Sequence, residues 1–354
     1  MVPEISVIMS VYNGEAYLVE AVESIRTQTF QNWELVIIND CSTDTTPELL
    51  EAFAREDARI KVHTNAVNLR LPKSLNKAIS LCTGKYIATM DADDIALPDR
   101  LEKQYRFMEE NPEVALSSCR FMTMKNGVYA AGGAGCRCDT ASIRAMLLVA
   151  NPILHPGVIA KADVMRRFLY DTTLTCTEDL ELWTRMAAEN LRIEILPECL
   201  MLYRLHEKQI TSTTLERQRV EVLKIQQKYY AALLQEMDAQ TQDFYIHGIY
   251  FREQADISRF LAYAKWLKRV GSKQFGKHAL NYALFEILAE YKRRGLSKAA
   301  VLKAMLSLNP FFAAAELLRR KNAAKADIAK CIQVAEAIGL RQIAGTHQYP
   351  IFGK

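Results

Sequence analysis

The sequence predicts an α/β protein in which a mainly parallel sheet is flanked by helices and followed by an all-helical C-terminal domain. Short apolar runs rich in β-branched residues alternate with segments whose apolar residues recur every three or four positions. From about Thr214 onward nearly all the periodicity is helical. A chain of 354 residues is long enough for two domains. We therefore expect one domain at 1–212 and a helical one at 213–354, which would carry contacts to an acceptor, a membrane surface or another subunit.

Four buried strands separated by helices are expected in the first part of the chain. The predicted strands are 5–12, 33–38, 60–63 and 86–90, and the predicted helices between them are 16–29, 48–55 and 71–81. Pro47 suits the first turn of the second helix. Strands joined by single helices at such short intervals are typical of a parallel sheet with helices on both faces.

The rest of the first domain is less regular, and the second is helical. We expect helices at 98–111, 142–150 and 178–189, strands at 114–124, 151–159, 193–196 and 200–203, and a glycine-containing loop at 127–139. Breaks in the helical region are expected near 238–242, Gly271, Gly295 and Asn309.

Composition favours a protein of a reducing compartment. The eight cysteines are dispersed, and Cys136 and Cys138, the two that lie close together, have no paired zinc-ligand spacing. The chain starts without a basic region and cleavable apolar segment, and no window approaches the ~18 apolar residues of a spanning helix. We expect a cytoplasmic protein whose contact with the inner face of the membrane is limited to its surface.

Charge is distributed unevenly. Residues 252–330 hold 17 Lys and Arg against 6 Asp and Glu, whereas the whole chain is only +4. Within this basic part, 299–318 is amphipathic and is followed by Arg319, Arg320 and Lys321. Such a segment either lies on an anionic membrane surface or packs in a small bundle with a solvated basic face. No nucleic-acid-reading motif is present, so no nucleic-acid partner is expected; the sequence predicts no oligomeric state.

Three carboxylates directly follow the fourth predicted strand. Asp91 and Asp93 point to the same side if the strand continues, so both can address one divalent cation and the phosphates bound to it. Asp94 follows at once. Ligands of open α/β sheets bind at the carboxyl ends of the strands. The alternative is a solvated acidic turn before the helix that starts near Pro98.

The order of the motifs resembles the family 2 glycosyltransferases, which are inverting enzymes with a GT-A fold. The resemblance covers about the first 210 residues and includes Ser6–Asn13, Gln28–Phe30, Asn39–Asp44, Ser74–Ala78, Asp91–Asp94 with Leu97–Arg100, Glu178–Asp179 with Leu182–Trp183, and Tyr203–His206. The sequence looks most like members that extend lipooligosaccharide, O-antigen or capsule chains in bacteria. It departs from the usual pattern at Arg70, where many members have glycine.

This resemblance implies a nucleotide-sugar donor, with a UDP-sugar expected. Tyr12 can stack on a uracil ring, and Asp40 can accept the imide N–H of that ring. Arg70 can pair with the diphosphate or pack against the base. The donor contacts are expected from Ser10, Tyr12, Asp40, Arg70, Asp91 and Ala92. The alternatives are a half-buried structural tyrosine for Tyr12, a turn cap for Asp40 and a surface arginine for Arg70.

The resemblance also implies a metal site and a general base. Asp93, Asp91 and His206 are the expected ligands of Mn²⁺ or Mg²⁺, and Asp94 is expected to support the loop. Asp179 is the expected base that deprotonates the hydroxyl of a glycan or lipid-linked glycan acceptor.

The supporting residues and the rival functions are less defined. Glu178 is expected to orient Asp179 or to contact the acceptor, although acidic residues also favour a helix N-terminus. His155 either lines the acceptor side or is a structural turn histidine. Alternative functions are a nucleotidyltransferase acting on sugar phosphates and a catalytically idle carbohydrate-binding relative.

Overall fold

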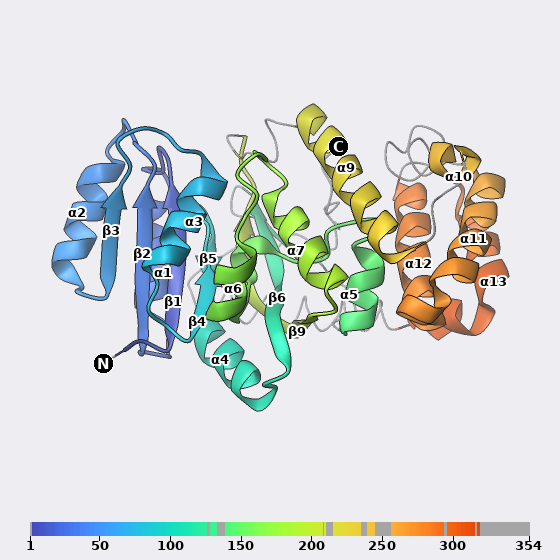
Figure 1. Ribbon diagram of the computed structural model, residues 1–354, viewed down its shortest axis with the longest axis horizontal. Helices are drawn as coiled ribbons and strands as arrows, with labels where there is room; N and C mark the ends of the chain where they lie inside the picture. Colours follow the sequence, from blue (N-terminus) through green and yellow to red (C-terminus); the bar gives the residue numbers. More distant parts are fainter. Residues whose placement is uncertain are drawn as a thin grey trace.

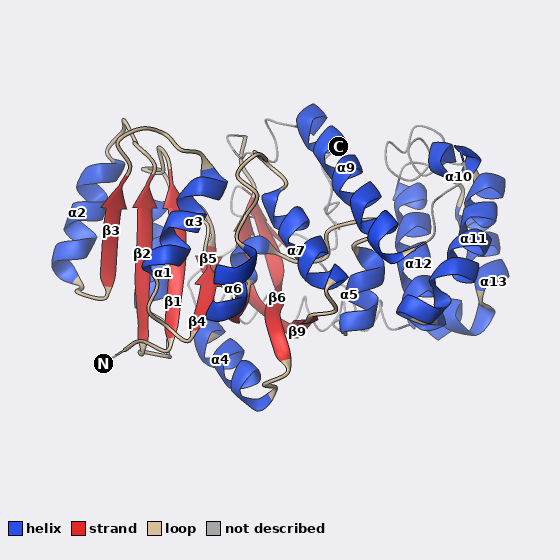
Figure 2. Ribbon diagram, viewed as in Figure 1, coloured by secondary structure: helices blue, strands red, loops and turns tan. Residues whose placement is uncertain are grey.

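The computed structural model describes residues 2–125, 128–132, 139–207, 209, 215–234, 239–244, 256–293, 296–315 and 317–318. The predicted α/β architecture is confirmed, with a curled sheet flanked by helices and further helices at one end of the molecule (Figures 1 and 2). The sheet order is β3-β2-β1-β4-β8-β6-β9-β5, and β7 pairs with β6.

The first half of the sheet is parallel. Its strands are β1 (Ile5–Val11), β2 (Trp33–Asn39), β3 (Ile60–Thr64) and β4 (Tyr86–Thr89), connected by helices α1 (Leu18–Arg26), α2 (Thr46–Glu56) and α3 (Leu71–Leu81). All seven elements lie where the hydrophobic pattern predicts them. Because these strands are parallel, their carboxyl ends share one edge of the sheet, which is where the candidate residues lie.

The second half of the sheet is mixed. It contains β5 (Ile95–Ala96), β6 (Val114–Lys125), β7 (Val128–Gly132), β8 (Ile159–Lys161) and β9 (Arg192–Arg204), with helices α4 (Arg100–Glu110), α5 (Thr140–Met146), α6 (Ala162–Phe168), α7 (Glu178–Ala188) and the 3₁₀ turn η1 (His155–Gly157). β8 is antiparallel to both β4 and β6, whereas β9 is parallel to β6. The short strand β8 therefore joins the two halves of the sheet.

Both faces of the sheet are buried. Alternate residues of β1 face opposite cores, as the two-residue period of a strand requires. Val7 and Met9 pack in the core that contains Leu18 of α1, whereas Ile8 packs with Leu75 of α3 in the other. This explains why the strands read as continuous apolar runs rather than as alternating ones.

The helical part extends the second of these cores. Its helices are α9 (Leu215–Leu233), α10 (Ala239–Asp243), α11 (Ile257–Phe275), α12 (Lys277–Arg293) and α13 (Lys298–Leu308). Helices α10 to α13 gather at the end of the molecule away from β3, and α9 runs beside α7 toward them (Figure 1). Tyr229 and Leu280 are buried in the same cluster as Trp183 of α7. None of the described helices is long and apolar enough to span a membrane. The division at residues 212 and 213 stays a prediction.

Four local expectations are corrected. β9 is one strand, with irregular register against β6, rather than two. The segment predicted as a strand at 151–159 forms η1 and only then β8. Part of the predicted 127–139 loop is strand β7, while residues 133–138 lie outside the described residues. Residues 239–243, within the break expected near 238–242, form α10.

The helix break expected at Gly271 occurs five residues later. Gly271 lies inside α11, where a Cβ would be only 3.3 Å from Leu280 Cδ1, so glycine there permits close packing of α12. The chain turns instead at Gly276, whose φ is +79°. The break expected at Gly295 lies outside the described residues, whereas α13 ends before Asn309 as predicted.

Candidate active site

Asp40 lies at the carboxyl end of β2 and is held rigidly. Its side chain is buried, and Oδ1 accepts hydrogen bonds from Asn65 Nδ2 at 2.7 Å and from the Leu69 amide at 2.8 Å. Oδ2 accepts from the Arg70 amide at 2.8 Å, which leaves it able to accept a second hydrogen bond. Asp40 is therefore a fixed acceptor at the sheet edge, and the segment 65–70 sets its orientation.

The residues that hold Asn65 come from a sequence motif. Ser74 Oγ lies 2.9 Å from Asn65 Nδ2, and Lys77 Nζ donates to Asn65 Oδ1 at 2.7 Å. Both lie on α3, where they share a helix face because they are three residues apart. The Ser74–Ala78 motif thus acts on Asp40 through Asn65.

Tyr12 and Ser10 lie beside Asp40, at the end of β1. The Tyr12 side chain is 53% exposed, so its ring is available for stacking, and Ser10 is half-buried. The loop after β1 is tied to the loop after β2, because the Asn13 amide donates to Ser42 Oγ at 3.0 Å. The Gly14 amide likewise donates to Thr46 Oγ1 at 2.9 Å. These bonds hold the ends of β1 and β2 in one arrangement.

Arg70 has an unusual backbone conformation. Its φ is +70° and ψ is 162°, a region populated almost only by glycine. Such a conformation costs about 1–3 kcal/mol in a residue with a Cβ. It aims the Arg70 amide at Asp40 and places the residue immediately before Leu71, where α3 begins. A glycine at this position would avoid the strain.

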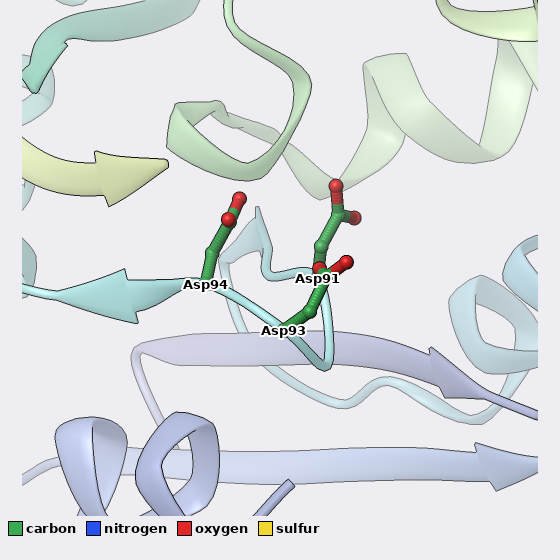
Figure 3. Close-up of side chains that lie close together, drawn as sticks. All are labelled: Asp91, Asp93 and Asp94. Atoms are coloured by element: carbon green, nitrogen blue, oxygen red, sulfur yellow. The ribbon is translucent and has the colours of Figure 1, made fainter. Parts of the chain in front are cut away.

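Asp91, Asp93 and Asp94 form one cluster of carboxylates. Asp91 and Asp93 lie on the turn after β4, and Asp94 lies at the entry to β5 (Figure 3). One oxygen of each lies within 4.8 Å of one oxygen of the other two. Burial raises the pKa of Asp93, and the charge of Asp91 raises it further. Burial likewise raises the pKa of Asp94 well above its usual value, with Asp93 and Asp91 adding to the effect.

The cluster has the features of a cation site. Asp94 Oδ1 accepts from the Arg204 amide at 2.8 Å, whereas its buried Oδ2 has no hydrogen-bond partner in the described part of the chain. His206 Nε2 lies 2.9 Å from Asp93 Oδ2. Carboxylate oxygens with one imidazole suit Mn²⁺, and carboxylates alone suit Mg²⁺. The residues therefore fit a divalent cation, with Asp94 tied to β9 as a support.

His155 connects Asp91 to the second acidic group. Its Nδ1 lies 3.2 Å from Asp91 Oδ1, and its Nε2 lies 3.0 Å from the Tyr170 hydroxyl. Burial opposes a charged imidazole, but Asp91, Asp179 and Glu178 together raise the pKa of His155 to about 9. An imidazolium at neutral pH partly compensates the carboxylates on its two sides.

Asp179 lies in the first turn of α7 and is fixed from two directions. Asn151 Nδ2 donates to Oδ2 at 2.8 Å, and the Leu180 amide donates to Oδ1 at 2.6 Å. Burial raises the pKa of Asp179 even though His155 and these donors lower it. A carboxylate with a raised pKa accepts a proton more readily, as a general base must.

Glu178 is buried beside Asp179. Its Oε2 has no hydrogen-bond partner in the described part of the chain. Burial, followed by the charge of Asp179, raises the pKa of Glu178 to about 7. The arrangement thus places two acidic groups close enough to His155 for both to raise its pKa. One group fits a cation and the phosphates it carries, and the other fits proton abstraction.

Three residues at this site, Asn151, Tyr170 and Arg100, were not predicted from the sequence. Asn151 and Tyr170 sit in irregular segments whose side-chain directions no periodicity predicts. Arg100 is fully buried, and its Nη2 donates to the Thr89 carbonyl at 2.8 Å and the Val158 carbonyl at 3.2 Å. This fixes the end of β4 against the turn after η1. The sequence did contain a signal for Arg100, because this charged residue belongs to the motif Leu97–Arg100.

A contact from the helical part reaches the start of α7. Glu221 of α9 accepts from the Thr177 hydroxyl at 2.8 Å, and its oxygens lie 3.4 Å from Thr175 Oγ1 and Cys176 Sγ. Arg217 pairs with the same carboxylate, with Nε at 3.2 Å from Oε1. Helix α9 therefore holds the three residues that precede Glu178.

Known proteins share the pattern of motifs and the fold. The family model described as "Glycosyl transferase family 2" matches residues 6–168. An uncharacterized glycosyltransferase of Methanocaldococcus jannaschii is 32% identical over 221 residues, which is 62% of this chain and 76% of that protein. The O-antigen biosynthesis glycosyltransferase WbnJ of Escherichia coli is 32% identical over 216 residues, covering 60% of this chain and 83% of WbnJ.

One solved structure is similar over most of the chain. The crystal structure of residues 1–349 of S. aureus TarS in complex with UDP matches with a TM-score of 0.53 and 20% sequence identity. The match covers 95% of this chain and 92% of that one. At this identity the similarity concerns the fold, and it includes the helical part.

Proposed function

Because the chain belongs to glycosyl transferase family 2, we propose that it moves a sugar from a nucleotide-diphosphate donor to a hydroxyl of a growing bacterial surface glycan. The acceptor class is suggested by WbnJ, whose name places it in O-antigen biosynthesis. The observation that carries the proposal is the pair of acidic groups, Asp91–Asp93 and Glu178–Asp179, which both lie near His155: Asp91 contacts its ring, and the charges of Asp179 and Glu178 help to raise its pKa.

The donor is a UDP-sugar in this proposal. A site for uracil needs a hydrogen-bond acceptor for the imide N–H, an aromatic ring that stacks on the base and polar groups at the edge of the ring. Asp40 Oδ2 supplies the acceptor, Tyr12 the stacking ring and Ser10 a hydroxyl. Arg70 contributes its amide to Asp40 and its guanidinium to the donor. Asp91 and Ala92 line the ribose side.

Asp91, Asp93 and His206 would hold the divalent cation, Mn²⁺ or Mg²⁺. Such a cation would neutralise charge on the departing diphosphate. Asp94 keeps the turn in place through the Arg204 amide, and Arg204 Nε donates to the Asp93 carbonyl at 2.8 Å. The turn is thereby attached to β9.

The transfer is a single displacement with inversion at the anomeric carbon. Asp179 takes the proton of the acceptor hydroxyl as its oxygen attacks, and Asn151 and the Leu180 amide keep the carboxylate pointed at that oxygen. Glu178 lies beside it and orients the base or the acceptor. No covalent nucleophile takes part.

Replacement of Asp179 by Asn tests the mechanism. Loss of a general base typically lowers the rate about 10²–10⁴-fold. We expect that loss in transfer from UDP-sugars, with UDP affinity unchanged by isothermal titration. Glu189→Gln, in the exposed pair with Arg167 at the far end of α7, is the matched control. Near-normal turnover in Asp179→Asn would refute the base assignment.

The reaction products separate the alternatives. A glycosyltransferase releases a nucleoside diphosphate, whereas a nucleotidyltransferase releases pyrophosphate. A wild-type protein that releases neither, with any of a panel of UDP-sugars and Mn²⁺ or Mg²⁺, would be an idle carbohydrate-binding relative. We expect UDP, seen first as slow hydrolysis of the donor in the absence of acceptor.

The second element of the proposal concerns the helical part, which binds peripherally to the surface of an anionic membrane and so lies near a lipid-linked acceptor. Along α13 and the helical residues 310–315 that follow it, Val301 and Phe312 are buried in the bundle, whereas Leu302, Leu306 and Phe311 are exposed, the last by 88%. An exposed apolar stripe on a basic region suits an anionic lipid surface. The basic run 319–321 lies outside the described residues.

Vesicle flotation tests this contact. Wild-type protein should bind phosphatidylglycerol vesicles at low salt, and phosphatidylcholine vesicles much less. Leu306→Ser with Phe311→Ser should abolish the binding, whereas Val67→Ser, an exposed apolar residue on the other part of the chain, should not. Wild-type protein that stays unbound to the anionic vesicles would rule the contact out.

A further inference from the structure

A cavity of about 260 Å³ opens between the segment before α3, the loop before α7 and the first turns of α9. Its polar lining includes Asn68, Arg70, Lys73, Thr172, Thr175 and Arg217. Three of these residues are cationic, and none of the described residues that line the cavity is a carboxylate. Arg217 is paired with Glu221, whereas Arg70 and Lys73 have no counter-ion among the described residues, so the excess positive charge favours an anion placed there.

The donors of this cavity are available. Neither the Arg70 guanidinium nor the Lys73 ammonium forms a hydrogen bond or ion pair with a residue that the structure describes. Arg217 uses Nε for Glu221, which leaves the two terminal nitrogens of its fork. The Asn68 amide and the Thr172 hydroxyl add neutral donors. Such a set is typical of sites for phosphate or carboxylate oxygens.

The walls are held in place by contacts outside the cavity. The loop before α7 is fixed because Thr177 donates to Glu221 and the Thr173 hydroxyl donates to Asp171 at 2.7 Å. The opposite wall is fixed because the Arg70 amide donates to Asp40. Arg70 also keeps its strained backbone where glycine would avoid the cost, which indicates that its side chain is used.

The position of the cavity suggests which ligand enters it. Thr175 is four residues before Asp179, and Arg70 separates the cavity from Asp40. In the proposed function the donor diphosphate is held at Asp91 and Asp93, and the Arg70 guanidinium contacts the donor, which leaves Lys73 and Arg217 for a further anion. Because Thr175 puts one wall of the cavity on the segment that leads into the base Asp179, that anion belongs to the molecule that the base deprotonates. We propose that this cavity binds an oxyanion, a phosphate or carboxylate, of an acidic acceptor glycan; the inference rests on the proposed function and specifies its acceptor.

Inorganic phosphate is the first probe, titrated calorimetrically into the full-length protein with Mn²⁺, once without UDP and once with UDP at saturation. Lys73→Met and Arg217→Met remove charge but keep the aliphatic stems. The double variant should bind phosphate at least about tenfold more weakly, since each lost charge-assisted bond weakens binding severalfold. Lys103→Met, in an exposed pair with Asp99, is the matched control and should bind phosphate like the wild type.

Competition identifies the source of the anion. D-glucuronate should displace phosphate and D-glucose should not, while UDP should leave phosphate affinity unchanged. Displacement by UDP would overturn the proposal, because the cavity would then be part of the donor diphosphate site. Displacement by UDP-glucuronate but not by UDP-glucose would overturn it too, in favour of an acidic donor sugar.

The variants give the remaining outcomes. Equal phosphate affinity in the wild type and the double variant would show that the cavity holds no anion. Hydrolysis of UDP-sugars, measured in separate assays of the same wild-type and variant preparations, reports on the proposed function. Its absence from the wild type would count against sugar transfer, whereas unchanged hydrolysis with lost phosphate binding in the double variant supports the acceptor site.

Discussion

Removal of the Glu221 carboxylate should slow the enzyme without weakening donor binding. Glu221 belongs to α9, yet it accepts the hydroxyl of Thr177 immediately before Glu178 and Asp179. The Thr177 side chain is buried, so Glu221→Ala leaves its hydroxyl without this acceptor. A hydrogen bond to a charged group contributes about 1.5–3 kcal/mol. The contacts at 3.4 Å from Thr175 and Cys176 add little, so the expected loss of folding free energy is about 2–3 kcal/mol.

The effect on catalysis follows from geometry. The segment that Glu221 holds leads directly into the first turn of α7, which carries the proposed base. A displacement of about 1 Å can lower a rate about 10²-fold. We expect kcat for Glu221→Ala to fall about 10–100-fold, with the dissociation constant of UDP within about twofold of the wild-type value. Glu221→Gln keeps an acceptor for the Thr177 hydroxyl, so its kcat should lie between those of the wild type and Glu221→Ala.

The assays are urea unfolding, initial rates of sugar transfer and calorimetric titration of UDP. Glu102→Ala is the matched control, because Glu102 also accepts a threonine hydroxyl, that of Thr29 at 2.7 Å, and pairs with an arginine four residues later. It lies on α4, where no candidate active-site residue depends on it. If kcat stays normal in Glu221→Ala while stability falls, the contact is structural only and the reasoning is wrong.

Three further predictions concern the cation site, the buried glutamate and the packing of the sheet. Asp93→Ala should remove the Mn²⁺-dependent part of UDP affinity, at least about tenfold, because it deletes a ligand beside His206. In calorimetric titrations the dissociation constant of UDP should be the same with Mn²⁺ and with EDTA for the variant, but not for the wild type. The pKa of Glu178 is raised from 4.5 to about 7, so the folded state favours the protonated acid. The contribution of Glu178 to the free energy of unfolding is therefore fully present below pH 4.5 and is lost as the pH rises through 7. Glu178→Gln should therefore be more stable than wild type by up to about 3 kcal/mol at pH 8.5 and equal at pH 4, measured by urea unfolding in EDTA; a constant difference would contradict this. Gly84→Ala would place a Cβ 2.7 Å from the Ser6 backbone nitrogen and should cost about 2–4 kcal/mol, read from thermal unfolding; an unchanged melting temperature would show that the strand yields.

The parallel half of the sheet was predictable because each of its elements has its own local signal. Buried strands read as apolar runs, and their helices repeat apolar residues at helical spacing, so the residues that follow each strand could be assigned to one edge. Asp40 and Asp91 were placed in this way, before any partner was known. Their orientation was not predictable, because it depends on Asn65, which lies in a loop, and on His155, in the 3₁₀ turn that was predicted as a strand.

The second half of the site depends on pairings that no local pattern encodes. Asn151 and Asp179 are 28 residues apart, and their contact requires η1, β8 and α6 to fold between them. β9 shows the same limit, because its register against β6 shifts around Arg120 and interrupts the alternation along the strand. The contact of Glu221 with Thr177 could not be predicted for a different reason. The pattern of an amphipathic helix does not show which of its polar residues contacts another part of the chain.

The motifs that indicated the family explain how the two halves stay in register. Asn76, on the same helix as the residues that hold Asn65, forms two hydrogen bonds with the Tyr170 backbone, at 2.9 and 2.8 Å. The Tyr170 hydroxyl then contacts His155, which contacts Asp91. One helix, α3, is thus linked to the proposed nucleobase corner through Asn65 and to the acidic groups through Tyr170. A shift of α3 would disturb both sides together, which is a physical reason for a polar motif on a helix that lies against the sheet.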